Sequence, residues 1–147
     1  MSHAAARLTQ SATRTTSRSK RIVAGRIIST VPILFMIFDG GIKLAKVAPV
    51  TEAFARLGYP ASLAPAIGIL ALACTAVYAI PRSSVLGAVL LTGYLGGAIA
   101  TQVRAGAGLF PIFFPLIIAA LIWGGLFLRD DRLLDFLPFR SVRDGQR

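Results

Sequence analysis

Cysteine and histidine are almost absent from this chain, which holds one of each, Cys74 and His3. A lone cysteine supplies neither the paired thiols that disulfide-exchanging enzymes need nor an intrachain disulfide. A zinc site would need clustered histidines or cysteines, and a haem inside a bundle would need axial histidines, so neither site can be assembled. We therefore expect no metal site, no resident cofactor and no catalytic residue, which favours a role other than that of an enzyme.

Charged residues are also scarce, at 15% of the sequence, whereas 55% of the residues are hydrophobic. Together with a mean hydropathy of +0.71, these values are ordinary for a small polytopic membrane protein and high for a soluble domain. The formal net charge of +10 would fit a nucleic-acid binder only if a folded domain carried the basic residues on one face. They gather instead before the first apolar run and after the last: Arg7, Arg14, Arg18, Lys20, Arg21, Arg129, Arg132, Arg140, Arg143 and Arg147. We therefore predict the lipid bilayer as a partner, and no nucleic acid.

Long apolar runs dominate the middle of the chain, and there are four of them, at residues 22–44, 63–80, 85–103 and 110–128. Each has about 18 to 23 residues, enough at about 1.5 Å rise per residue to cross a hydrocarbon core of about 30 Å. The sequence therefore predicts an all-α fold, an integral membrane four-helix bundle that runs up-down-up-down within residues 22–129.

The two ends of the chain are polar. Residues 1–21 contain no acid and no apolar run, which predicts a disordered basic cytoplasmic tail; the composition also fits a transit peptide, although no amphipathic period supports one. A cleaved signal peptide is disfavoured because the first apolar run is long and contains Arg26 and Asp39. Residues 130–147 are predicted to form a C-terminal cytoplasmic tail.

The loops predict the orientation of the bundle. With both termini in the cytoplasm, most lysines and arginines lie on the cytoplasmic side, as the positive-inside rule requires. The longest loop, 45–62, is then external, and within it Pro49 can begin a helix and Gly58 can end it. Val50, Phe54 and Leu57 share one face, so we predict a short external amphipathic helix over about residues 49–58.

Small residues mark the third apolar run. Gly93 and Gly97 are four apart, with Gly96 beside them, which predicts close helix packing in lipid. The partner is either another helix of the same chain, which we favour, or a second copy of the chain.

Polar side chains converge near the predicted external end of the bundle. Asp39 and Lys43 are spaced i, i+4 on one helix face, and Tyr94 and Gln102 share a stripe on the third helix. Arg104 ends that helix, and Tyr59 lies in the loop above. Two interpretations stay open: a structural ion pair that fastens helix ends, or a ligand-binding site.

Five stretches in this order resemble the DoxX-like family of small bacterial inner-membrane proteins: "FDGGIKL", "VTEAFARLGYPASLA", "GILALACTAVYAIPR", "SVLGAVLLTGYLGGAIATQVR" and "WGGLFLRD". The similarity covers about residues 26–131 and implies a four-helix membrane bundle. Residues that match the family's recurring pattern are Asp39, Lys43, Tyr59, Pro60, Pro81, Arg82, Gly93, Tyr94, Gly96, Gly97, Thr101 and Arg104. The family is named after a subunit linked to a thiosulfate:quinone oxidoreductase.

The chain departs from this family at three positions. Gln102 stands where relatives commonly have histidine, Ala71 where many have glutamate, and Ala107 where an acid is usual. Without the histidine and the buried acid, two groups that could carry protons are missing, which argues against a proton-coupled quinone reaction.

Two functions follow as hypotheses. The first is a non-catalytic subunit or a module that binds a small molecule, with a quinone as candidate ligand, in a redox-linked complex of the bacterial inner membrane. Its candidate partners are redox-complex subunits or a second copy of the chain. The alternative is a small dimeric proton-coupled transporter resembling the four-helix multidrug-resistance proteins, for which Asp39 is the candidate membrane carboxylate.

Overall fold

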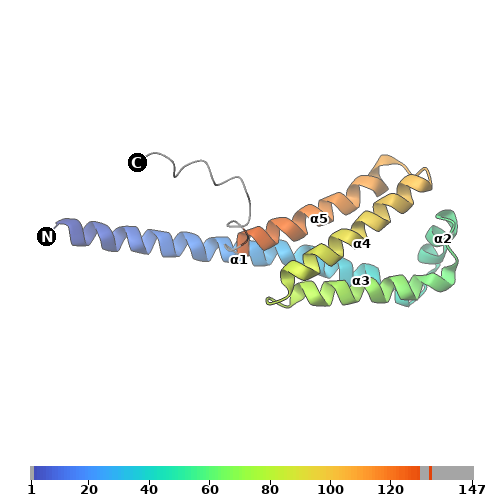
Figure 1. Cartoon of the computed structure of the whole chain (residues 1–147), viewed down its shortest axis with the longest axis horizontal. Helices are drawn as coiled ribbons and strands as arrows, with labels where there is room; N and C mark the ends of the chain where they lie inside the picture. Colours follow the sequence, from blue (N-terminus) through green and yellow to red (C-terminus); the bar gives the residue numbers. More distant parts are fainter. Residues whose placement is uncertain (1, 130–132, 134–147) are drawn as a thin grey trace.

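The structure is a computed structural model that describes residues 2–129 and 133, with side chains described from residue 19 onward. Its elements are the helices α1 (Ser2–Leu44), α2 (Ala48–Arg56), α3 (Ala64–Ala79), α4 (Ser84–Arg104) and α5 (Leu109–Arg129), and a 3-10 turn, η1 (Ala61–Leu63). Figure 1 shows these elements in chain order. Over the residues described, the predicted all-α fold is confirmed.

Four segments are long and apolar enough to cross a membrane: Ser19–Leu44, Ala61–Ala79, Ser84–Arg104 and Leu109–Arg129. They coincide closely with the four apolar runs of the sequence, so the prediction of four such helices is confirmed by length and composition. The bundle's lipid-facing surface is accordingly rich in exposed large apolar side chains, among them Ile27, Phe38 and Leu70.

Helix α1 differs from the expectation for the N-terminus. We expected disorder over residues 1–21, whereas α1 begins at Ser2 and continues without a break into the first apolar run (Figure 1). The stretch contains neither glycine nor proline, so nothing in it stops a helix that the apolar segment has already nucleated. The predicted C-terminal tail, 130–147, lies outside the described residues except for Leu133.

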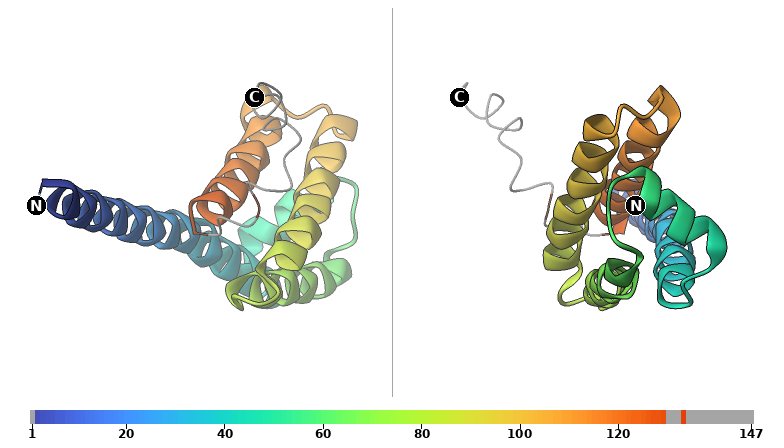
Figure 2. Two further views of the ribbon diagram at one scale, coloured as in Figure 1. Left: turned by 60° about the vertical axis from the view of Figure 1, so that its left-hand side comes forward. Right: turned by 90° about the vertical axis from the view of Figure 1, so that its right-hand side faces the viewer.

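The four long helices form a ring in which α1 packs against α3 and α5, and α4 packs against the same two helices. Helices α1 and α4 therefore lie diagonally opposite each other. From the turn at residues 80–83, α3 and α4 diverge, and α2 lies at the end where they are farthest apart (Figures 1 and 2). On the side of the bundle where α2 lies, the helices surround a space that their side chains do not fill.

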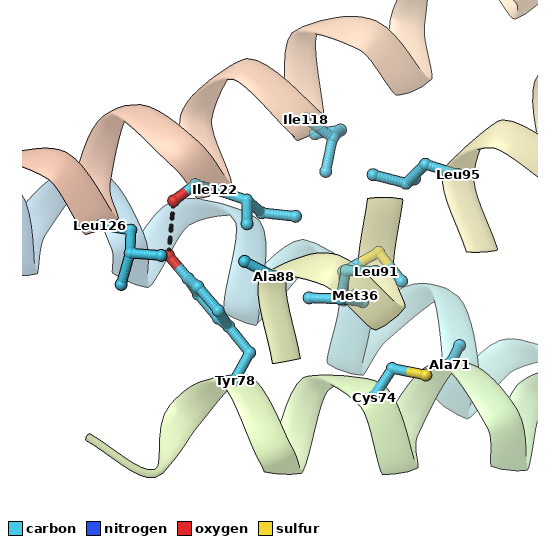
Figure 3. Packing of buried hydrophobic residues seen from close by; sticks show 10 residues of the cluster. All are labelled: Met36, Ala71, Cys74, Tyr78, Ala88, Leu91, Leu95, Ile118, Ile122 and Leu126. Carbon is cyan, nitrogen blue, oxygen red and sulfur yellow. Dashed lines mark hydrogen bonds between the residues drawn. The ribbon is translucent and has the colours of Figure 1, made fainter. Parts of the chain in front are cut away.

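The helices share an apolar core, part of which borders that space. Its buried members are Met36, Ala71, Cys74, Tyr78, Ala88, Leu91, Leu95, Ile118, Ile122 and Leu126 (Figure 3). The Tyr78 hydroxyl donates to the carbonyl oxygen of Ile122 at 2.9 Å and lies 3.1 Å from the Ser29 hydroxyl. A buried phenol requires such partners, so this contact joins α3 to α5 and α1.

Glycines bring the helices together, but not those that the sequence suggested. A Cβ added to Gly68 of α3 would lie 2.8 Å from the Gly40 carbonyl oxygen of α1, and one on Gly87 of α4 would overlap the Tyr78 backbone. At Gly93, Gly96 and Gly97 an added Cβ would meet no described atom within 4 Å. The favoured packing of these three glycines against another helix of the same chain is therefore wrong, whereas packing against a second copy stays a prediction.

Candidate functional site

The space between the diverging helices is a cavity of about 1030 Å³ that all five helices line. Most of its wall is apolar, including Phe35, Met36, Ile67, Leu95, Phe114 and Ile118. Cavities that bind drug-sized ligands typically measure about 300–1,000 Å³ and combine apolar walls with a few polar groups. The cavity therefore has the size and the composition of a ligand site.

One polar cluster interrupts the apolar wall, formed by Asp39 and Lys43 of α1 and Tyr94 of α4. The Lys43 ammonium donates to Asp39 Oδ2 and to the Tyr94 hydroxyl, the latter at 3.2 Å, and the Tyr94 hydroxyl lies 3.4 Å from Asp39 Oδ2. The side chains of Lys43 and Asp39 are 15% and 24% exposed. Since α1 and α4 are diagonal to each other, these bonds cross the middle of the bundle.

Local structure explains why the pair forms. One helical turn separates Asp39 from Lys43, so the side chains lie one above the other, with the acid on the N-terminal side, the more favourable order. Partial burial makes the ion pair costly to break, because either charge alone would be left in an apolar wall. The pairing predicted from the spacing is present in the structure.

Helix α2 covers one end of the cavity. Its apolar face buries Val50 and Phe54, which pack with Ile42, Tyr59 and Ile67. Gly58, with φ of 74°, adopts the left-handed conformation that ends the helix and turns the chain back towards α3. The structure thus has an amphipathic helix in the stretch where the sequence predicted one.

Three contacts tie the segment after α2 to α4. The Arg104 guanidinium donates to the Leu57 carbonyl oxygen at 2.9 Å and lies 5.4 Å from the centre of the Tyr59 ring. The hydroxyls of Tyr59 and Thr101 are 3.4 Å apart. Arg104 therefore holds the cover of the cavity in place.

The six candidate site residues divide accordingly. Five line the cavity, namely Asp39, Lys43, Tyr59, Tyr94 and Gln102, whereas Arg104 lies outside its wall. Sequence reasoning missed the apolar lining, including Cys74 and Phe114. No signal in the sequence could have found these residues, because cavity-facing and lipid-facing positions of a membrane helix carry the same apolar residue types.

A metal site is not visible among these groups. Across residues 19–129 and 133, whose side chains are described, no three His, Cys, Asp or Glu side chains lie together as metal ligands would. The polar side chains that line the cavity offer one ammonium, two phenol hydroxyls, one threonine hydroxyl, one carboxylate, one amide and the Cys74 thiol. They are suited to binding and orienting a polar head by hydrogen bonds.

Comparison with known proteins gave one match. A model of the DoxX-like family matches residues 27–125, a range that includes every residue of the cavity wall. No curated protein and no solved structure matches the chain.

Proposed function

The chain belongs to the DoxX-like family, and on this basis we propose that it is a membrane protein that binds a small amphiphile, a quinone being the leading candidate, without itself catalysing a reaction. The observation that carries this proposal is the largely apolar cavity with the cluster of Asp39, Lys43 and Tyr94 in its wall. The site needs a ligand with a small polar head and a larger apolar part.

The chemistry of the cluster fits a head that accepts hydrogen bonds. Two of the three N–H donors of Lys43 go to Asp39 and Tyr94, and the Tyr94 O–H donates to Asp39, so one Lys43 N–H remains for a ligand. A quinone head offers carbonyl oxygens that accept such a bond, and no donor. Asp39 holds the ammonium towards the cavity and balances its charge, so the site carries no net charge that would repel an uncharged ligand. The surrounding aromatic and aliphatic side chains would bury the apolar part.

The setting of the site is part of the same proposal. We infer a bundle that runs up-down-up-down in the bacterial inner membrane with both termini in the cytoplasm, because the basic residues gather at those ends. The cavity and α2 would then lie on the outer side. Since the chain has one cysteine and one histidine, a partner subunit of a redox-linked complex would carry the electrons.

A second candidate function, a dimeric proton-coupled transporter, would use Asp39, which does lie in the cavity wall. Such a transporter needs a carboxylate that alternates between proton and substrate. The ion pair with Lys43 opposes that exchange, so the geometry supports this function less well. Proteoliposomes would decide: substrate-driven proton flux that Asp39→Asn abolishes would replace the binding proposal with transport.

Cys74 makes binding measurable, because it is the only cysteine of the chain and lines the cavity. We would purify the full-length protein in nanodiscs and follow maleimide labelling of Cys74 while adding decylubiquinone. The expected result is a saturable slowing of labelling. Labelling that decylubiquinone never slows, together with no co-purifying amphiphile by lipid mass spectrometry, would refute the proposal.

A matched pair of variants tests the role of the ammonium. Lys43→Met should raise the decylubiquinone concentration that half-protects Cys74 from maleimide by about tenfold or more. The reason is that a hydrogen bond to a charged group contributes about 1.5–3 kcal/mol. Lys46→Met is the control, since Lys46 is exposed and lies outside the cavity wall. Lys43→Arg, which keeps the charge, should retain most of the affinity if the cation is what the ligand recognises.

A further inference from the structure

We propose that the ligand enters the cavity sideways from the bilayer, through an opening between α3 and α4, and that its apolar chain remains in that opening. This inference rests on the proposed binding function and specifies the ligand class: an amphiphile with a hydrogen-bond-accepting head and at least one long chain. A short water-soluble molecule would not need such a route.

The end of the cavity beneath α2 is closed by contacts already described. Val50 and Phe54 fill it with apolar side chains, and the bonds from Arg104 and Tyr59 fasten the following segment to α4. Entry by this end would require breaking these polar ties and exposing the buried face of α2.

On the side between α3 and α4, aliphatic residues and glycines line the cavity and face outward at the same time. Leu70 of α3 is 54% exposed and Leu90 of α4 is 42% exposed, yet both belong to the cavity wall. Gly93 and Gly97 are also exposed lining residues, and a Cβ on either would meet nothing within 4 Å. Phe38 of α1 is also an exposed lining residue, at 64%, but its ring occupies its position, whereas the two glycines leave theirs open. The wall therefore has an opening between α3 and α4.

The depth of this opening decides what can use it. Leu70 lies near the middle of the span Ala61–Ala79, and Gly93 near the middle of the span Ser84–Arg104. The opening therefore faces the hydrocarbon of a bilayer, where water-soluble ligands do not accumulate. Figure 1 shows the same two helices diverging towards α2.

The opposite side of the cavity, between α1 and α5, is occupied by aromatic rings. Phe35 and Phe114 pack edge to face there with ring centres 5.1 Å apart, and Phe38 lies on the same side of α1. Large aromatic side chains thus occupy the α1–α5 side, whereas on the α3–α4 side two glycines have no side chain to fill the space. A chain passing over Gly93 and Gly97 would place its head beside Tyr94 and Lys43.

Two neighbouring glycines provide a matched test. Gly96 and Gly97 are both exposed with open space around an added Cβ, but only Gly97 lines the cavity. In the Cys74 labelling assay, Gly97→Leu should raise the decylubiquinone concentration needed for half-protection by about tenfold or more. This is the effect of leaving roughly two methylenes of the decyl chain unburied. Gly96→Leu should leave protection unchanged. Equal protection in the two variants would overturn the proposed opening.

The chain requirement has its own control. The same quinone ring with a methyl group in place of the decyl chain should protect Cys74 less well in the parent protein, and Gly97→Leu should not weaken it further. A parallel loss for both quinones would contradict a chain lying in the opening. Thermal unfolding of both leucine variants verifies that they fold.

A lipid probe tests the opening without any quinone. In nanodiscs that contain phosphatidylcholine with a diazirine at the end of one acyl chain, cross-links should reach Cys74, which is buried inside the cavity, as well as the exposed Ile69. Gly97→Leu should remove the cross-links to the buried position only. Cross-links confined to Ile69 in the parent protein would refute the opening, whereas quinone binding failing alone would refute only the proposed function.

Discussion

Replacing Gly87 with alanine should destabilise the bundle, and the same change at Gly93 of the same helix should not. A Cβ on Gly87 would overlap the backbone of Tyr78, so α4 can no longer approach α3. At Gly93 an added Cβ meets no described atom within 4 Å. The two variants share one helix and one chemical change, and they differ only in what the methyl group meets.

The magnitude follows from these surroundings. Forcing one extra carbon into a packed site costs about 1–3 kcal/mol, and the obstacle at Gly87 is backbone, which cannot rotate away. Alanine in place of glycine within a helix gains about 0.5–1 kcal/mol, a gain that Gly93→Ala should keep in full. Because the helix gain is common to both variants and cancels, we expect Gly87→Ala to be less stable than Gly93→Ala by about 1–3 kcal/mol.

Cys74 supplies the assay. It is buried, at 5% exposure, so a thiol-reactive fluorophore labels it rapidly only once the bundle opens. Heating both variants in the same detergent should give the Gly87→Ala protein a transition several degrees below that of the parent, with Gly93→Ala at or above it. If the two variants had the same transition temperature, α3 and α4 would not meet at Gly87, and the packing of these two helices would be refuted.

Three further predictions concern polar contacts. Tyr78→Phe removes the hydroxyl that joins α3 to α1 and α5, and the same melting assay should show a loss of about 0.5–1.5 kcal/mol; an unchanged transition would contradict the contact. Asp39→Asn alone should destabilise more than the double variant Asp39→Asn/Lys43→Met, because the single change leaves a part-buried cation without its counter-charge; a double variant that melts below the single one would show that the pair is not coupled. Arg104→Ala should speed amide hydrogen exchange in residues 57–63, the segment that Arg104 ties to α4, whereas Lys46→Ala should not; equal exchange would remove Arg104 from that role.

The proposals share one physical basis, the divergence of α3 from α4. Helices that stayed in contact along their whole length would leave no cavity, and the polar cluster of Asp39, Lys43 and Tyr94 would then only fasten the bundle. Here the cluster borders a large apolar space, so the Lys43 N–H that is not used within the cluster is available to a ligand.

Length and hydropathy by themselves determined the four apolar helices and their approximate bounds, because both are sums over neighbouring residues. Helical spacing alone also placed Asp39 beside Lys43 and put Val50 and Phe54 on one face. Local composition did less well at the N-terminus, where α1 continues to Ser2, since a polar stretch without helix breakers follows the helix it adjoins.

Only the tertiary structure decided which residues meet across the bundle. It brought Tyr94 to the ion pair and placed Arg104 on the cover instead of in the cavity. Within α4 it made Gly87, and not Gly93, Gly96 or Gly97, the glycine of close approach to another helix. The physical reason is that positions facing lipid, a cavity or a neighbouring helix all carry apolar or small residues. Their neighbours depend on how each helix is rotated and how the helices cross, which no local pattern records.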